Sequence, residues 1–158
     1  MDFTAKSFDI FNKEWAIVCA GEQEHYNAMT ISWGGLGTLW GKPVVTVYVK
    51  PVRYTYQFMN DSEYFTVSFY DEQYRNAMQV FGSTSGRNTD KEAVTGFVPV
   101  KLEHGVTYEQ AKVTLVCRKI YYNDLVLENI PEEVVQRTYT TEAPHRMFIG
   151  EVIDVIRK

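Results

Sequence analysis

The chain has 158 residues, with 16 Lys and Arg against 20 Asp and Glu, which gives a formal net charge of -4 at pH 7. This length suits one domain, residues 1–158, with a sizeable buried core. A composition of 45% hydrophobic and 15% aromatic residues indicates a globular, strand-rich protein and excludes a disordered one. The acidic balance argues against nucleic-acid binding, because affinity for phosphate backbones requires an excess of Lys and Arg.

The cysteines and histidines do not form a metal-binding pattern. Cys19 and Cys117 lie far apart in apolar runs, so we expect two buried core residues rather than zinc ligands or a redox dithiol. His25, His104 and His145 are not at ligand spacing, and no metal is predicted. The sequence shows neither a signal-peptide pattern nor an apolar stretch of membrane-span length, so a cytoplasmic protein without a membrane partner is expected.

The first half of the chain predicts strands separated by turns. Apolar runs at 14–20 and 26–33 are joined by a short polar segment, which predicts a hairpin. A glycine-rich link follows from residue 34 to residue 41. The run 43–49 is rich in β-branched residues throughout, and this predicts a central strand that is buried on both faces.

The middle of the chain mixes short helices with one further strand. Helical spacing of aromatic residues predicts a helix over 53–60, and the alternation in 65–69 predicts a half-buried strand. Asp71 suits a helix N-cap, and Gly82 suits the end of that helix. A polar loop is expected from residue 83 to residue 90.

Two long strands, over 111–121 and 147–156, are predicted near the end of the chain. Many strands with only a few short helices indicate a mainly β protein, folded as a closed or nearly closed antiparallel barrel. No internal repeat or linker interrupts this order.

Two segments contain groups suited to binding a phosphate. Arg53 and Thr55 follow Pro51, and the stretch 82–91 combines glycines, hydroxyls and cations. Backbone amides, hydroxyls and positive charges are the groups that bind a phosphomonoester. The same residue types are common in turns, so the stretch 82–91 by itself favours a solvated loop over a phosphate site.

The strand predicted over 26–33 carries polar side chains among apolar ones, namely Asn27, Thr30 and Ser32. A buried polar group without a partner costs roughly 1–3 kcal/mol. These residues are therefore expected to have partners, either in the backbone or in a ligand.

Four blocks in one order resemble a known family. They are Asn27-Ala28-Met29-Thr30-Ile31-Ser32-Trp33-Gly34, Lys50-Pro51-Val52-Arg53-Tyr54-Thr55, the stretch 83–91 with Ser85-Gly86-Arg87, and His145 followed by Gly150-Glu151-Val152. Together they are similar to the flavin reductase-like, FMN-binding split-barrel family, in particular its flavoredoxin-like branch. The resemblance covers nearly the whole chain.

The resemblance implies a homodimer of antiparallel split β-barrels, with flavin mononucleotide (FMN) near the subunit interface and its ring along residues 27–33. Amides and hydroxyls of Met29, Thr30 and Ser32 would face the flavin. Trp33 would wall the pocket, although a core position fits it as well. Arg87 fits a solvated loop charge as well as a ligand contact. The implied cofactor-binding residues are Asn27, Met29, Thr30, Ser32, Trp33, Arg53, Thr55, Ser83, Ser85, Gly86 and Lys91, with Arg53, Thr55, Ser83, Ser85 and Lys91 at the phosphate.

The resemblance also suggests a nicotinamide contact. His145 stands where related reductases often have a histidine near the nicotinamide, but Pro144 replaces the acidic residue that precedes it in many of them. A strand-start residue without a role fits His145 equally well. Hydride transfer to a flavin needs no protein nucleophile, so the lack of a catalytic triad does not exclude an enzyme.

Three functions follow as hypotheses. The first is an FMN-dependent oxidoreductase that passes electrons from NADH or NADPH to a flavin, a protein or a small acceptor. The second is a flavoredoxin-type electron carrier with a redox partner protein and no nicotinamide site. The third is a non-catalytic split barrel that binds another phosphorylated ligand or only another subunit.

Overall fold

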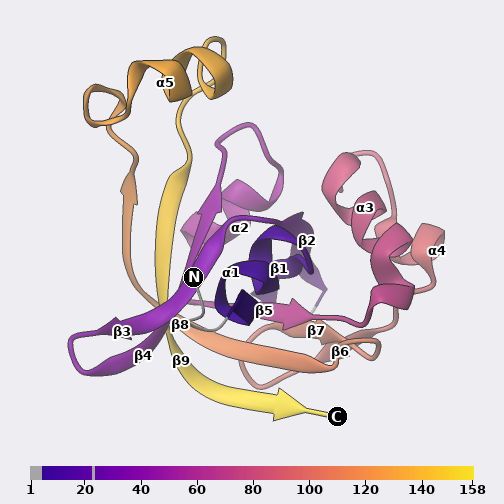
Figure 1. Cartoon of the computed structure of the whole chain (residues 1–158). Coiled ribbons are helices and arrows are strands. Elements are labelled where there is room, and N and C mark those ends of the chain that lie inside the picture. The colour runs from indigo at the N-terminus through magenta and orange to yellow at the C-terminus, as the bar shows by residue number, and fades with distance from the viewer. Residues whose placement is uncertain (1–4, 23) are drawn as a thin grey trace.

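One antiparallel sheet organises residues 5–22 and 24–158, which the computed structural model describes (Figure 1). Its strands follow in the spatial order β2-β1-β5-β8-β9-β4-β3. Their bounds are β1 Ala16–Glu22, β2 His25–Ile31, β3 Gly34–Leu39, β4 Lys42–Val49, β5 Tyr64–Phe69, β8 Val113–Asp124 and β9 Arg146–Arg157. The strands β6 (Pro99–Lys101) and β7 (Val106–Tyr108) form a second, two-stranded sheet.

The helices are short and lie around the sheet. They are α1 (Ala5–Asn12), α2 (Thr55–Asp61), α3 (Arg75–Ser83), α4 (Lys91–Thr95) and α5 (Glu132–Thr138), with 3-10 turns at η1 (Glu72–Tyr74) and η2 (Leu127–Asn129). Helices α3 and α4 lie together on one side, whereas α5 stands apart at the end of β8 and β9 (Figure 1). No helix in the described part of the chain is long and apolar enough to cross a membrane.

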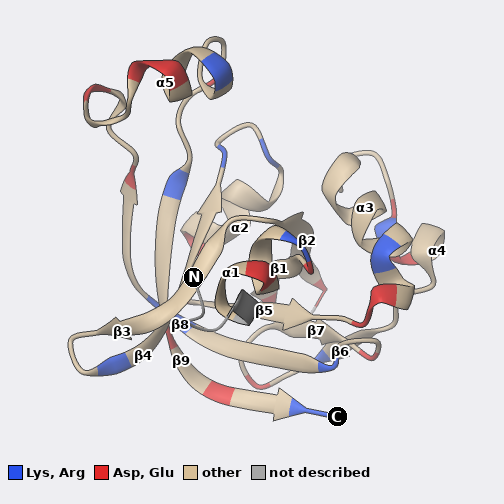
Figure 2. Cartoon of the chain, viewed as in Figure 1, with Lys and Arg blue, Asp and Glu red and all other residues tan. Residues whose placement is uncertain are grey.

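Helix α5 has a charge distribution that stabilises it at this exposed place. Glu132 and Glu133 occupy its first turn and Arg137 its last turn, and Figure 2 shows acidic and basic residues at its opposite ends. These charges complement the helix dipole. The segment that connects β8 to β9, residues 125–145, is therefore ordered by a helix of its own although it lies beyond the sheet.

The prediction of a mainly β, antiparallel fold is confirmed. The expected hairpin is present as β1 and β2, and the two long strands are present as β8 and β9. The alternative of a closed barrel is not observed: the end strands β2 and β3 do not pair with each other among the described residues.

The strand β1 is buried on both faces because it separates two hydrophobic clusters. Ala16, Val18 and Ala20 face one cluster, whereas Ile17 and Cys19 face the other. Period-two alternation of side chains makes this arrangement unavoidable for a strand covered on both sides.

The prediction that 65–69 is half-buried is wrong, because the β6–β7 sheet covers its polar face. Thr66 and Ser68 are both buried. The Thr66 hydroxyl donates to the backbone oxygen of Val106 (2.6 Å), and the Ser68 hydroxyl lies 2.9 Å and 3.0 Å from the hydroxyls of Thr107 and Thr114. These bonds satisfy polar atoms that burial would otherwise penalise.

Two further expectations need correction. The strand predicted over 43–49 is β4, which lies second from the edge, with β3 formed by the glycine-rich link beside it. Its Tyr48 is only half-buried because one face of β4 lines a cavity. Gly82 does not end a helix but lies within α3, where an added Cβ would be 3.2 Å from the Cβ of Thr30. Close approach of α3 to β2, not a helix end, explains this glycine.

Candidate functional site

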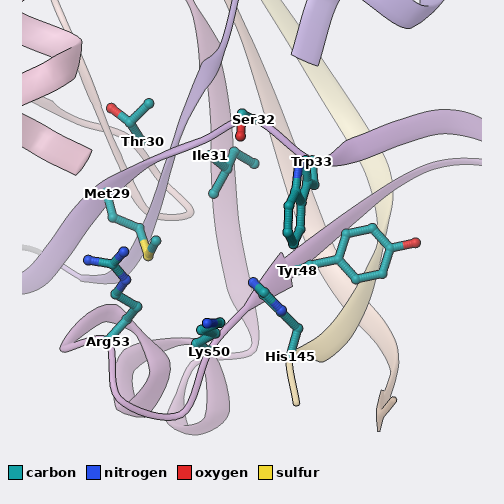
Figure 3. A pocket seen from close by; sticks show the side chains of 9 residues that line it. All are labelled: Met29, Thr30, Ile31, Ser32, Trp33, Tyr48, Lys50, Arg53 and His145. Atoms are coloured by element: carbon teal, nitrogen blue, oxygen red, sulfur yellow. The ribbon is translucent and has the colours of Figure 1, made fainter. Parts of the chain in front are cut away.

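Two adjoining cavities lie beside β2. The first, of about 240 Å³, is here named the strand cavity. Its lining side chains come from β2 and the two residues after it, from β4 and the turn after it, and from the residue before β9 (Figure 3). The second, of about 280 Å³, is named the loop cavity and lies against the end of α3 and the loop that follows it. Met29 and Arg53 line both cavities.

The structure places every predicted site residue on one of these cavities, although they come from four distant parts of the sequence. The strand cavity is lined by Met29, Thr30, Ser32, Trp33, Arg53 and His145, together with Ile31, Tyr48 and Lys50. The loop cavity is lined by Asn27, Met29, Arg53, Thr55, Ser83, Ser85, Gly86 and Lys91, among others. The two cavities thus bring together residues that are far apart in the sequence.

A buried side-chain bond connects β2 to the start of α2. The amide nitrogen of Asn27 donates to the hydroxyl oxygen of Thr55 over 2.7 Å, and both residues are buried. Gly86 lies directly over this pair, since an added Cβ would meet Oδ1 of Asn27 at 2.1 Å. Only glycine allows the loop backbone to approach β2 this closely.

The buried side chain of Lys91 connects the start of α4 to β2 and α3. Its side chain is 6% exposed, and Nζ donates to the backbone oxygens of Ala28 in β2 and Phe81 in α3, each at 2.8 Å. Burial, and then the nearby charge of Arg53, lower the pKa of Lys91 to about 8. Two of the three ammonium donors are engaged, which leaves one for the loop cavity.

Positive charge dominates the loop cavity. Arg53, Arg87 and Lys91 line it, and Glu142 is its acidic lining residue among the described side chains. The carboxylate of Glu142 is itself paired with the ammonium of Lys50 at 2.6 Å. The cavity therefore favours an anion of the size of a phosphate group.

The serine and threonine side chains are not equivalent. The Ser85 hydroxyl oxygen accepts from the backbone N–H of Arg87 (3.2 Å), which leaves the hydroxyl proton to be donated. The Thr30 hydroxyl instead donates to the backbone oxygen of Met78, and Figure 3 shows this side chain directed away from the other labelled residues. The expectation that the Thr30 hydroxyl faces a ligand is therefore corrected, because it holds α3 against β2.

An aromatic and imidazole wall bounds the strand cavity. Trp33 is 50% exposed, and its ring lies 5.0 Å from the ring of His145 (Figure 3). Nδ1 of His145 lies 2.7 Å from the hydroxyl of Tyr139, which is buried. Burial, followed by the charges of Lys50 and Arg53, lowers the pKa of His145 to about 4, so the imidazole is neutral at pH 7.

Sequence reasoning did not assign Lys50, Tyr139 or Glu142 to the site. Tyr139 and Glu142 belong to the segment between β8 and β9, which carries no motif and no strong periodicity. Lys50 begins the block that contains Arg53 and Thr55. Its position just after a buried strand is the feature of the sequence that could have indicated a site residue.

We expect His145 to make folding stability depend on pH. An unfolded chain protonates this imidazole near its ordinary pKa of 6.5, whereas the folded chain does so at about 4. Between these values the unfolded state binds more protons, so stability falls as the pH is lowered from 6.5 to 4. Urea unfolding at pH 6.5, 5 and 4 should show a smaller loss for His145→Gln than for the parent protein. An equal loss in both proteins would contradict this role.

Comparison with known proteins gives the same fold. A flavoredoxin from Methanosarcina acetivorans has a TM-score of 0.73 at 18% identity, over 92% of this chain and 68% of that chain. An FMN-binding protein from Thermus thermophilus with bound p-hydroxybenzaldehyde has a TM-score of 0.72 at 19% identity, over 91% and 71%. A NADH:FAD oxidoreductase from Streptomyces globisporus C-1027 has a TM-score of 0.68 at 18% identity, over 92% and 75%.

A search of curated proteins finds no match. The sequence model of one family, described as the flavin reductase like domain, matches residues 8–158. This span includes all of the cavity residues described above. The chain therefore belongs to the flavin reductase-like domain family.

Proposed function

We propose that the protein binds FMN across the strand and loop cavities and acts as an oxidoreductase that passes electrons from NADH or NADPH to a flavin, a protein or a small acceptor. The observation that carries this proposal is the cationic loop cavity, which meets the strand cavity at Met29 and Arg53. FMN consists of a phosphate and an attached ring system, so it needs an anion site beside a partly apolar site.

The residues present fit FMN. Arg53 and Lys91 would bind the phosphate by charge-assisted hydrogen bonds, with Ser83 and Ser85 as further donors. Gly86 lets loop amides approach the same point. The ring would lie along Met29 to Trp33, where backbone groups of β2 supply polar contacts. The bound flavin supplies the hydride-accepting chemistry, and the protein supplies position and electrostatics.

The wall formed by Trp33 and His145 supports a place for the nicotinamide. A neutral imidazole beside the cavity does not repel the cationic ring of an oxidised nicotinamide, whereas a protonated one would. The half-exposed Trp33 offers a flat apolar surface at the same point.

A flavoredoxin-type electron carrier is the second candidate, with a redox partner protein as its electron donor. Lys50 supports it, since this cation of the strand cavity is already paired with Glu142 at 2.6 Å and lies 3.5 Å from the backbone oxygen of Thr138. With Lys50 engaged, fewer free cations remain for the phosphates of a nicotinamide dinucleotide.

An anaerobic absorbance experiment separates these functions. The protein is incubated with FMN, freed of unbound flavin, and then mixed with NADH or NADPH without air. A retained flavin spectrum that bleaches supports the reductase, and one that bleaches only with a protein donor supports the carrier. Failure to retain FMN and to oxidise NAD(P)H in its presence contradicts both.

We further propose that the chain forms a homodimer. Leu36 (54% exposed) and Trp40 (66% exposed) lie on the β3–β4 hairpin at the edge of the sheet, and Tyr122 on β8 is 54% exposed. Large exposed apolar side chains at a sheet edge favour association. Sedimentation at micromolar concentration should give twice 18.3 kDa, and Leu36→Lys with Trp40→Lys should give the monomer. A monomeric parent protein would contradict the proposal.

The pKa of Lys91 predicts how FMN binding depends on pH. A phosphomonoester loses its second proton at about pH 6, so FMN keeps its charge from pH 7 to 9.5. Lys91 loses its own charge over that interval because its pKa is about 8 in the free protein. We therefore expect FMN affinity to fall between pH 7 and 9.5 while riboflavin affinity stays constant. Fluorescence titrations at four pH values test this, and equal slopes for the two ligands would refute it.

A further inference from the structure

The segment between β8 and β9 brings a buried tyrosine against the wall of the strand cavity. Tyr139 directly follows α5, and its backbone N–H donates to the backbone oxygen of Val135 (2.8 Å), so the helix fixes its place. The residue is 8% exposed. Its hydroxyl lies 2.7 Å from Nδ1 of His145, and the two rings meet edge to face with their centroids 5.6 Å apart. Tyr139 is not among the described residues that line the strand cavity, so it can act there only through His145.

Contacts on both sides of Tyr139 hold this segment in place. The carboxylate of Glu142 is paired with the ammonium of Lys50 at 2.6 Å. The backbone N–H of Leu125, at the end of β8, donates to the backbone oxygen of His145 over 3.0 Å. The phenol and the imidazole are therefore held beside each other by the fold, and their hydrogen bond does not depend on a loose loop.

Only one direction of this hydrogen bond satisfies every group. The imidazole of His145 is neutral at pH 7, so it carries one N–H and one lone pair, and the bond made by one nitrogen determines which nitrogen has the proton. If Nδ1 carried it, Nδ1 would donate to the Tyr139 oxygen, and the phenol proton would have no acceptor among the described residues. If the phenol donates instead, Nδ1 accepts and the imidazole proton lies on Nε2.

The second nitrogen of the imidazole is the one available to a ligand. Nε2 is farther from the backbone than Nδ1, and Figure 3 shows the ring extending toward Trp33 in the wall of the strand cavity. Nε2 of His145 has no hydrogen bond to the residues that the structure describes. A proton on Nε2 attracts an acceptor atom of a ligand beside Trp33, whereas a lone pair there would repel it.

We propose that Tyr139 is a positioning residue, which donates its hydroxyl proton to Nδ1 of His145 and thereby keeps the imidazole proton on Nε2 as a hydrogen-bond donor to the strand cavity. The ligand atom that this donor recognises is an acceptor, such as a carbonyl oxygen at the edge of a planar ring. The tautomer is a property of the free protein, and only the effect on catalysis rests on the proposed function.

Long-range proton–nitrogen NMR spectra of the isotope-labelled protein at pH 7 test the tautomer, because protonated and unprotonated imidazole nitrogens have separate shifts. His145→Gln assigns the signals. The parent protein should show Nδ1 unprotonated and Nε2 protonated. Tyr139→Phe removes only the hydroxyl, and the two nitrogen shifts should move toward each other because the tautomers then mix. Tyr64→Phe is the matched control: Tyr64 stacks on His104 with ring centroids 4.0 Å apart and lines neither cavity, so the His145 signals should not change.

A double-mutant cycle separates positioning from a purely structural role. With saturating FMN, Tyr139→Phe should lower kcat/KM for NADH about threefold to tenfold, which corresponds to one hydrogen bond. In a His145→Gln background the same substitution should change kcat/KM by less than about twofold, because the imidazole through which Tyr139 acts is gone.

The contrary outcomes are distinct. A parent protein whose His145 carries its proton on Nδ1, or a Tyr139→Phe spectrum like that of the parent, would overturn the proposal. An equal loss of kcat/KM in both backgrounds would overturn it as well, because Tyr139 would then support the fold and not act through His145. A protein that neither binds FMN nor oxidises NADH would refute the proposed function, while the NMR spectra would still decide the role of Tyr139.

Discussion

Replacing Arg53 with alanine is expected to weaken FMN binding by about 10-fold to 100-fold, because a charge-assisted hydrogen bond to phosphate is worth about 1.5–3 kcal/mol. Riboflavin lacks the phosphate, and its affinity should change by less than about threefold. Arg53 is exposed, and the one hydrogen bond that its side chain makes to the described residues is long, 3.4 Å from Nη1 to the backbone oxygen of Gly82. The side chain is thus free to reorient toward a phosphate, and its removal should hardly affect folding.

Arg137→Ala is the matched control for this experiment. Arg137 is also exposed, but it lies in the last turn of α5 and lines neither cavity. Titrations with both flavins should leave this variant like the parent protein. If Arg53→Ala weakened FMN and riboflavin equally, the residue would not bind the phosphate.

Replacing Lys91 with methionine should have a different signature, with losses of both stability and flavin affinity. The substitution leaves the backbone oxygens of Ala28 and Phe81 without the ammonium that joins β2 to α3. We expect a loss of roughly 2 kcal/mol or more in the free energy of unfolding. Because the position of β2 then relaxes, riboflavin should be weakened together with FMN.

Urea unfolding and flavin titration of Lys91→Met measure these two effects on one protein sample. Lys101→Met is the control, because Lys101 is an exposed residue of β6 whose ion pair with Glu24 is also exposed. Such a pair is worth less than about 1 kcal/mol. Unchanged unfolding of Lys91→Met would show that the bonds to Ala28 and Phe81 contribute little, and unchanged riboflavin affinity would show that β2 does not depend on them.

Much of the candidate site was accessible from the sequence because its residues stand in short, ordered blocks. In the sequence, Asn27 stands out as a polar residue in an apolar strand, and Thr55 as a hydroxyl-bearing residue after a buried strand. The structure shows that they bond to each other. The sequence indicates Gly86 as part of a loop suited to binding a phosphate, and the structure shows that Asn27 leaves no room there for a side chain.

Other site features depend on contacts between distant segments and left no local signal. The pKa of His145 follows from burial and from Lys50 and Arg53, which are about 90 positions away in the chain. The hydroxyl of Thr30 could be assigned to α3 only once α3 was placed against β2.

By itself, the sequence determined the strand-rich class, the β1–β2 hairpin, the long strands β8 and β9 and the phosphate-competent blocks. Each of these is encoded locally, by composition, by period-two alternation or by turn chemistry. The tertiary structure alone decided that the sheet stays open, that the glycine-rich segment 34–39 is an edge strand, and that two cavities adjoin along β2. Strand pairing and cavity shape are set by side chains far apart in sequence, so no local pattern records them.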